Sequence, residues 1–414
     1  MNVLLHTFGC KANQYDSEVV RQRLEDAGCA VVDAPEAADA AVVNSCTVTH
    51  VGDAKLRALV RRLARRNPSI RTVVMGCAAA RDHGRIAALP NVAGVVGGAD
   101  AEAVARALGV AAGAEPGLRR FASGSRAWLK IQDGCDEHCT FCATVLARGR
   151  SRSREPETLV REAAGLARSH AEIVLTGVHI GTYGRDRGGP PLSALVERLV
   201  ERVDGVRFRL SSVEATEVDD RLIELMARSP DRLAPHLHAP LQSGSDRLLR
   251  RMGRHWYTAA GYRAAVERLA GRVTPLGLGA DVMTGFPGET AADHDATRRL
   301  LETLPITYLH VFPYSEREGT AAVRLGPAVE PAAARERAAE LRALGAEREA
   351  AHRARRAGAA ADLVLESRRG GVHEAVTEDY LTALLPADAP WVLGRSRVSA
   401  RLVSRGPALW AEAA

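Results

Sequence analysis

Three cysteines near the middle of the chain offer the clearest chemistry. Cys135, Cys139 and Cys142 have the spacing C-x3-C-x2-C in the segment KIQDGCDEHCTFCATVLARGR. One short loop of this kind can place three thiolates on an iron–sulfur cube and leave the fourth iron open, because a closed cluster takes four thiolates. A zinc site is the alternative, but zinc sites usually pair C-x2-C units or add histidine in a closed tetrahedral set. The spacing therefore favours an open iron–sulfur site.

Three further cysteines follow predicted strands in the first part of the chain. Strand-like apolar runs alternate there with helix-length segments, which predicts a parallel, helix-covered sheet. These runs are residues 2–8, 40–44, 71–75 and 92–96. Cys10, Cys46 and Cys77 come just after the first three runs. Because carboxyl ends of parallel strands meet at one edge, we expect a second three-cysteine site. Cys29, at a predicted helix end, is assigned to the structure.

Composition limits the class of protein. The 414 residues are enough for two or three domains, and the net charge of +6 permits a polyanionic partner without requiring one. We find no signal peptide and no apolar run long enough to span a bilayer. The seven cysteines then indicate a reducing compartment, in which thiolates bind metals rather than form disulfides. We expect a cytoplasmic protein with no membrane segment.

The central part of the chain predicts a partial parallel barrel, whose ligands collect at the carboxyl-terminal mouth. The candidate strands are residues 128–131, 172–176, 206–210, 235–238, 278–283 and 308–311. Polar or glycine-containing segments follow several of them, and these segments include Thr176, Gly177, Glu214 and Gln242. Arg148, the first of four alternating arginines after the cysteine loop, could bind substrate phosphates or a cofactor carboxylate, or could belong to a solvated charge run.

Two other segments carry expectations of their own. Residues 53–67 predict a helix with apolar residues on one face and arginines elsewhere, either a solvated basic face or an RNA-phosphate contact. After a long helix at 330–358, short strand-like runs alternate with glycine and proline turns, which is typical of a small antiparallel β-barrel.

The cysteine loop resembles that of the radical S-adenosylmethionine (SAM) superfamily, in which the amino and carboxylate groups of SAM fill the open iron site. The phrases TFGCKANQYDSE, VVNSCTVTHVGDAKLR and VVMGCAAA resemble the amino-terminal domain of methylthiotransferases, specifically the branch acting on N6-threonylcarbamoyladenosine (t6A) in tRNA. The resemblance implies an auxiliary 4Fe–4S cluster on Cys10, Cys46 and Cys77. It also implies that Thr176 and Gly177 lie near the methionyl amino group, and Glu214 and Gln242 near the nucleoside. The carboxyl-terminal part resembles the TRAM domain, an RNA-binding module.

These expectations combine into an α/β protein in four parts. They are an amino-terminal parallel-sheet domain (1–112), a linker (113–125), a partial (β/α)6 radical SAM barrel (126–358) and a TRAM-like barrel (359–414). The resemblance implies that two 4Fe–4S clusters and SAM add a methylthio group to carbon 2 of t6A at position 37 in the tRNA anticodon loop. An electron donor such as a flavodoxin or ferredoxin, and a sulfur donor, are the other expected partners.

Two alternatives remain open from the residues. A related enzyme could act on another tRNA adenosine or on a ribosomal-protein side chain. A non-catalytic iron–sulfur RNA-binding regulator would use the basic helix and the terminal barrel, but it would not need the polar groups at the strand ends.

Overall fold

The computed structural model describes residues 1–47, 50–111, 117–122 and 125–413. These residues form two compact units. The first contains residues 1–119, 132–152 and 315–323, and the second contains residues 120–131, 153–314 and 324–414. Part of the predicted linker, namely residues 113–116 and 123–124, lies outside the described residues. The predicted domain boundaries at 126 and 359 stay predictions.

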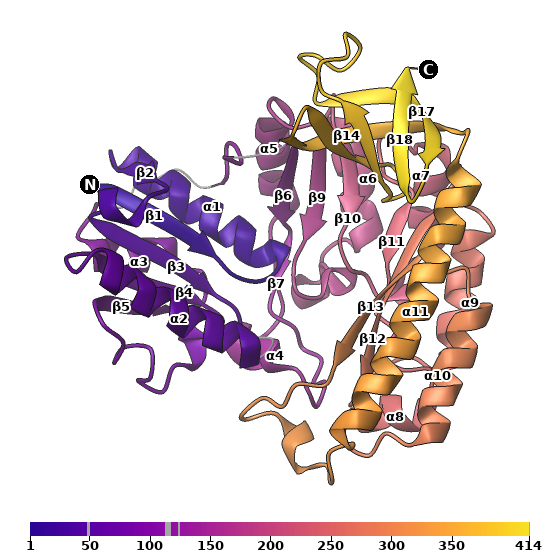
Figure 1. The fold of residues 1–414 in the computed structure, drawn as a ribbon, viewed down its shortest axis with the longest axis horizontal. Coiled ribbons are helices and arrows are strands. Elements are labelled where there is room, and N and C mark those ends of the chain that lie inside the picture. Colours follow the sequence, from indigo (N-terminus) through magenta and orange to yellow (C-terminus); the bar gives the residue numbers. More distant parts are fainter. Residues whose placement is uncertain (48–49, 112–116, 123–124, 414) are drawn as a thin grey trace. The chain divides into compact units, whose positions relative to one another are not determined.

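The first unit contains the expected parallel sheet, with strand order β2-β1-β3-β4-β5 (Figure 1). Its strands are β1 (Asn2–Thr7), β2 (Ala30–Val32), β3 (Ala40–Ser45), β4 (Arg71–Gly76) and β5 (Val92–Gly97). Its helices are α1 (Lys11–Asp26), α2 (His50–Arg66), α3 (Ala101–Leu108) and, in the cysteine-loop segment, α4 (Ala143–Arg148). The short edge strand β2 had not been predicted.

Alternating strand residues explain why this sheet is covered on both faces. Val42 packs in a core with α1 and α3, whereas its neighbour Val43 packs in a separate core with α2. Successive side chains of a strand point to opposite faces, so a strand between two helical layers is apolar throughout. Cys29 is buried in the core with α1 and α3, which confirms its structural assignment.

The central strands of the second unit are parallel and follow the predicted runs closely. They are β6 (Arg126–Lys130), β9 (Glu172–Thr176), β10 (Arg207–Leu210), β11 (His236–His238), β12 (Gly277–Thr284) and β13 (Tyr308–Pro313). They form two three-stranded sheets, β6-β9-β10 and β11-β12-β13. Two isolated parallel bridges, Phe208 to Leu233 and Ser212 to His238, connect the region of β10 with that of β11. The arrangement agrees with a partial barrel.

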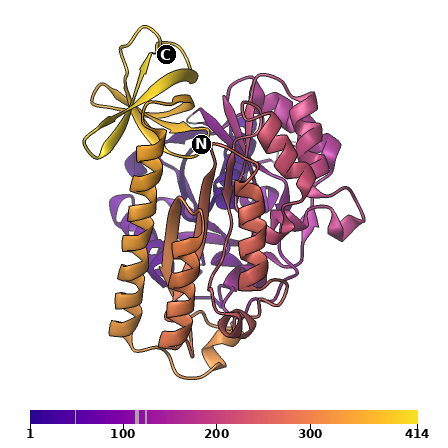
Figure 2. The ribbon, with the colours of Figure 1, turned by 90° about the vertical axis from the view of Figure 1, so that its right-hand side faces the viewer.

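Helices connect these strands. They are α5 (Pro156–Ala167), α6 (Leu192–Arg202), α7 (Asp220–Arg228), α8 (Asp246–Arg251), α9 (Ala259–Ala270) and α10 (Ala291–Thr303). The long helix α11 (Pro331–Arg356) packs along β13 and leads into the carboxyl-terminal strands at its upper end in Figure 2. Among the described residues, none of the helices has the length and apolar character needed to cross a membrane.

The carboxyl-terminal strands form a closed barrel in the order β14-β15-β16-β18-β17. Their bounds are β14 (Ala360–Arg369), β15 (Val372–Thr377), β16 (Thr382–Pro386), β17 (Arg397–Arg405) and β18 (Ala408–Ala413). The barrel prediction is confirmed, with one correction. β18 had not been predicted, and it closes the barrel by pairing parallel to β16, so the barrel is not antiparallel throughout.

A buried charge cluster fixes this barrel to the central sheet. Glu172 of β9 accepts hydrogen bonds from Arg207 and Arg209 of β10 at 2.7–2.9 Å, and all three side chains are almost fully buried. Arg207 also reaches Asp362 of β14, while Arg209 donates to the carbonyls of Thr377 and Glu378. Burial alone would raise the pKa of Glu172, but Arg209 and Arg207 outweigh it and hold the pKa far below its usual range.

Glu172→Gln is expected to lower the free energy of unfolding by about 3–5 kcal/mol, because it leaves two buried guanidinium groups without their shared carboxylate. Urea unfolding followed by circular dichroism measures the change. The pKa of Glu172 is lower in the folded state than in the unfolded state. The difference in free energy of unfolding between wild type and variant is therefore fully present above the unfolded-state pKa of Glu172, and it shrinks as the pH falls below about 4. Glu157→Gln, which removes an exposed carboxylate beside Arg202, is the matched control and should leave the midpoint nearly unchanged.

Candidate active site

Cys10, Cys46 and Cys77 lie at the carboxyl ends of β1, β3 and β4, as the sequence predicted. The backbone before two of them has left-handed glycines, with φ of +103° at Gly9 and +96° at Gly76. A Cβ added to Gly9 would stand 2.9 Å from the Cβ of Cys46, and one added to Gly76 would stand 2.6 Å from the carbonyl oxygen of Ser45. Glycine is required at both positions, and the close approach brings the strand ends together.

Asn13, in the first turn of α1, organises these strand ends. Its Nδ2 donates to the carbonyls of Phe8 and Ser45, both at 2.9 Å. Its Oδ1 lies 4.0 Å from the sulfur of Cys10 and 3.8 Å from the sulfur of Cys77. The sequence pattern did not identify Asn13, because the start of α1 buries polar side chains such as Asn13 and Asp16, which break the apolar period. The signal in the sequence that could have identified Asn13 is its place three residues after Cys10, in the segment Cys-Lys-Ala-Asn.

The second cysteine set lies on the loop before α4. Cys142 precedes α4 directly, and its backbone N–H donates to the carbonyl of Cys139 at 3.1 Å. The Cys135 N–H donates to Gly149 at 3.0 Å, and the Glu137 N–H points to the Cys135 sulfur at 3.4 Å. All three side chains are partly exposed, so the loop presents three thiols near the surface of the first unit. This donor set fits the expected open 4Fe–4S cluster.

Arg148, the last residue of α4, connects the two cysteine sets. Its Nη1 donates to both carboxylate oxygens of Asp133, at 2.9 and 3.0 Å, beside the cysteine loop. Its Nη2 donates to Asn13 at 2.6 Å and to Asp16 at 2.9 Å, and its Nε lies 3.2 Å from the sulfur of Cys77. The side chain is only 3% exposed, so Arg148 is not part of a solvated charge run. Binding of a cofactor carboxylate by Arg148 stays a prediction.

Electrostatics at Cys77 follow from this contact. Burial raises the pKa of the Cys77 thiol to about 11, and Arg148 opposes that rise. Burial alone would lower the pKa of Arg148, but Asp16, Cys77 and Asp133 outweigh it and raise the pKa. Arg148 therefore stays cationic next to a sulfur that must be an anion when it binds iron.

The residues predicted to contact SAM belong to the second unit. Thr176 is almost fully buried at the end of β9, its carbonyl accepts from the N–H of Ile131 at 2.9 Å, and Gly177 follows it directly. Glu214 follows β10 and Gln242 follows β11. Gln242 has a left-handed φ of +63°, and its N–H donates to the carbonyl of Asp281 at 2.8 Å. All four residues lie at strand ends, as predicted, and their roles toward SAM stay predictions.

Arg254, which sequence reasoning missed, links two of these segments. Arg254 donates to Oε1 of Glu214 and, at 2.8 Å, to the hydroxyl of Tyr257. The Tyr257 hydroxyl in turn donates at 2.6 Å to the carbonyl of Leu241, the residue before Gln242. Burial raises the pKa of Glu214, although Arg254 opposes the rise. The other oxygen, Oε2, is buried and has no hydrogen-bond partner among the described residues. A buried unpaired carboxylate oxygen at a strand end fits a polar ligand such as the ribose of SAM.

His238, the last residue of β11, and Glu289, which follows β12, both have polar partners in the second unit. His238 contacts Asp281 at 2.9 Å and the hydroxyl of Tyr308 at 3.0 Å, while Glu289 accepts from the N–H of Gly285 and from Arg337. Both are satisfied polar groups of the second unit.

Comparisons with known proteins agree with this architecture. Residues 2–97 match the model described as uncharacterized protein family UPF0004, and residues 129–301 match the radical SAM superfamily. A radical SAM methyltransferase, TsrM from Kitasatospora setae, has a similar fold, with a TM-score of 0.58 and 17% identity over 75% of this chain and 72% of that chain.

Relatives of higher identity are methylthiotransferases. Threonylcarbamoyladenosine tRNA methylthiotransferase MtaB of Bacillus subtilis is 39% identical over 83% of this chain and 80% of its own length, and that of Rickettsia prowazekii is 34% identical over 92% and 90%. A tRNA-2-methylthio-N(6)-dimethylallyladenosine synthase of Parafrankia sp. is 35% identical over 88% and 78%. With these relatives and both domain matches, the chain belongs to the radical SAM methylthiotransferase family, in the MtaB branch of threonylcarbamoyladenosine tRNA methylthiotransferases.

Proposed function

We propose that this enzyme adds a methylthio group to carbon 2 of t6A at position 37 of tRNA, with one 4Fe–4S cluster on Cys135, Cys139 and Cys142 and a second on Cys10, Cys46 and Cys77. The observation that carries the proposal is Arg148, which bonds Asp133 beside the first cysteine set and lies 3.2 Å from the sulfur of Cys77 in the second. Two three-thiol sites joined by one buried side chain suit a reaction that uses both.

When bound, the clusters and SAM supply the radical chemistry and the sulfur and methyl groups, and the protein supplies binding, orientation and exclusion of water. Asn13 holds the strand ends that carry Cys10 and Cys46 in place. At the mouth of the central barrel, Thr176, Gly177, Glu214 and Gln242 would hold SAM. No side-chain base can take hydrogen from an aromatic adenine carbon at neutral pH, which is why such a reaction needs a radical.

The tRNA substrate is part of the proposal because the MtaB relatives are named for it. The target base must leave its stack to reach the site, as is common for RNA readers that use loop bases. The electron donor, such as a flavodoxin or ferredoxin, the sulfur donor and the cytoplasmic location stay predictions. Family membership argues against the non-catalytic regulator considered from the sequence.

A second substrate is favoured by the Parafrankia relative, whose name gives dimethylallyladenosine. Nucleoside mass spectrometry of tRNA from a strain that lacks the gene decides between the two. We expect methylthio-t6A to disappear, unmodified t6A to accumulate, and the gene on a plasmid to restore the product. Loss of methylthio-dimethylallyladenosine instead would establish the second substrate, and unchanged tRNA would move the target to a protein side chain.

A further inference from the structure

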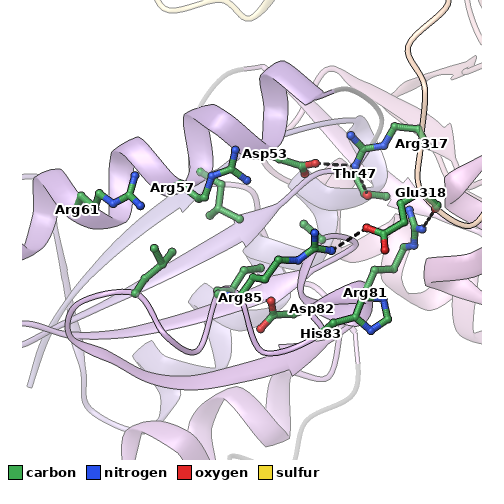
Figure 3. Close-up of a pocket in the computed structure, with 14 residues that line it drawn as sticks. Thr47, Asp53, Arg57, Arg61, Arg81, Asp82, His83, Arg85, Arg317 and Glu318 are labelled. Atoms are coloured by element: carbon green, nitrogen blue, oxygen red, sulfur yellow. Dashed lines mark hydrogen bonds and ion pairs between the residues drawn. The ribbon is translucent and has the colours of Figure 1, made fainter.

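A basic pocket of about 500 Å³ lies in the first unit, bordered by α2, by the segment that follows β4, and by residues of 315–323 (Figure 3). Figure 3 shows Arg57 and Arg61 along α2, and Arg81 and Arg85 on the segment after β4. The pocket is lined by five arginines and only three carboxylates. The arginines are Arg57, Arg61, Arg81, Arg85 and Arg317, and the carboxylates are Asp53, Asp82 and Glu318.

The three carboxylates already have partners. Asp53 accepts from Arg317 at 2.7 Å, and Glu318 accepts from Arg85 at 3.0 Å. Asp82 accepts from the backbone N–H groups of residues 86 and 87, at 2.6 and 3.2 Å. Arg57 and Arg61, both exposed, have no hydrogen-bond or ion-pair partner in the part of the chain that the structure describes. The pocket therefore keeps an excess of positive charge.

Arg317 adds a second, independent observation. It is 6% exposed and lines the pocket, and its Nη2 donates to Thr47 at 2.9 Å as well as to Asp53. Its Nε and Nη1 are buried and have no hydrogen-bond partner among the described residues. Buried guanidinium donors nearly always have acceptors, so this pair of N–H groups points to an oxygen-rich anion.

The pocket adjoins the candidate auxiliary cluster site. Two of its lining residues, Thr47 and Ala78, come directly after the proposed ligands Cys46 and Cys77. On the other side the positive charge continues along α2, where Arg61 and Arg65 line a neighbouring hollow. Arg57, Arg61 and Arg65 are spaced four residues apart, which places them on one side of the helix.

We propose that this pocket binds a phosphodiester group of the tRNA backbone close to the nucleotide being modified. Arg317 is the buried donor, and Arg57 and Arg61 contact the phosphate from the open side. The proposal rests on the proposed function, because it takes tRNA as the substrate. Arginine forks fit phosphate oxygens in a bidentate way, and a recess of this volume admits a phosphate with its ribose. An acidic protein would instead present single carboxylates to the rim of the pocket, and these would not fill the recess as a phosphate with its ribose does.

Binding of a t6A-containing anticodon stem-loop RNA to the reconstituted enzyme, measured by fluorescence anisotropy over a series of salt concentrations, tests the proposal. For the R57Q/R61Q variant we expect affinity to fall about 10-fold or more at low salt. The slope of log affinity against log salt concentration should also become shallower by about 0.7 for each arginine that no longer neutralises a phosphate of a single strand. For this variant, which lacks two arginines, the expected change in slope is roughly 1.4.

Arg62→Gln is the control for the R57Q/R61Q variant, because Arg62 is also exposed on α2 but does not line the pocket. It should bind RNA with the wild-type slope. Iron content and circular dichroism establish that the variants are folded and loaded. A wild-type affinity and slope in R57Q/R61Q would overturn the proposal. If that variant bound RNA normally but was reduced more slowly by a flavodoxin, the pocket would be a binding site for the electron donor instead. If the wild-type enzyme binds no such RNA, the proposed function itself fails.

Discussion

Cys46→Ala is expected to abolish formation of the methylthio product while reductive cleavage of SAM to 5′-deoxyadenosine continues. The reason is that Cys46 belongs to the set on β1, β3 and β4, whereas in the proposed function SAM cleavage depends on the set at Cys135, Cys139 and Cys142. The variant should also lose about half of its iron after anaerobic reconstitution, because it lacks a ligand of one of the two proposed 4Fe–4S clusters. Alanine keeps the Cβ that packs against Gly9, so the strand ends are preserved.

Cys29→Ala is the control for this experiment, since Cys29 is a buried core residue of the same unit. It should keep full iron content and full product. Cys139→Ala is the complementary variant, and it should lose SAM cleavage as well as product. Methylthio product from the Cys46→Ala enzyme, or an unchanged iron content, would show that the second cluster site is elsewhere.

Arg148→Met is expected to have the second large effect. The substitution removes the guanidinium group that pairs with Asp16 and Asp133. It also removes the N–H group that lies 3.2 Å from the Cys77 sulfur. Breaking a buried ion pair typically costs about 3–5 kcal/mol, which urea unfolding of the cluster-free protein can measure. Hydrogen bonds to cluster sulfurs raise the reduction potential, so we expect a lower midpoint potential for the auxiliary cluster in an EPR-monitored titration.

The potential separates a positioning role from a merely structural one. Arg150→Met is the matched control, because the Arg150 side chain is 93% exposed, and it should change neither stability nor potential. Arg148→Lys should recover only part of both, since an ammonium group cannot reach the several acceptors that the guanidinium fork contacts. A destabilised Arg148→Met enzyme with a wild-type potential would show that Arg148 acts only through the fold.

Local sequence patterns predicted most of the fold. The apolar runs located β1, β3, β4 and β5 and all six central strands to within two residues at each end. The face of α2 with Leu56, Leu59, Val60 and Leu63 is buried, as its helical spacing indicated. Errors occurred where a segment was short or polar. β2 has only three residues, β18 pairs in parallel with β16, and the start of α1 buries the polar side chains of Asn13, Asp16 and Ser17.

The candidate site divides in the same way. The six cysteines could be chosen from spacing and from their places after strands, because both are local properties of the chain. Asn13 and Arg254 could not, since Asn13 contacts Ser45 and Arg148, and Arg254 contacts Glu214, all of which are distant in sequence. The role of Arg317 depends on contacts with Thr47 and Asp53, more than 260 residues earlier.

By itself, the sequence of this protein determined its class of fold, its two sets of three thiols and its family, because these depend on residue type, spacing and short-range period. Only the tertiary structure decided which charges are buried and what they contact. Arg148 and Arg150 are two residues apart in one basic run, yet one is 3% and the other 93% exposed. That difference arises from distant segments that pack around Arg148, and no local pattern encodes it.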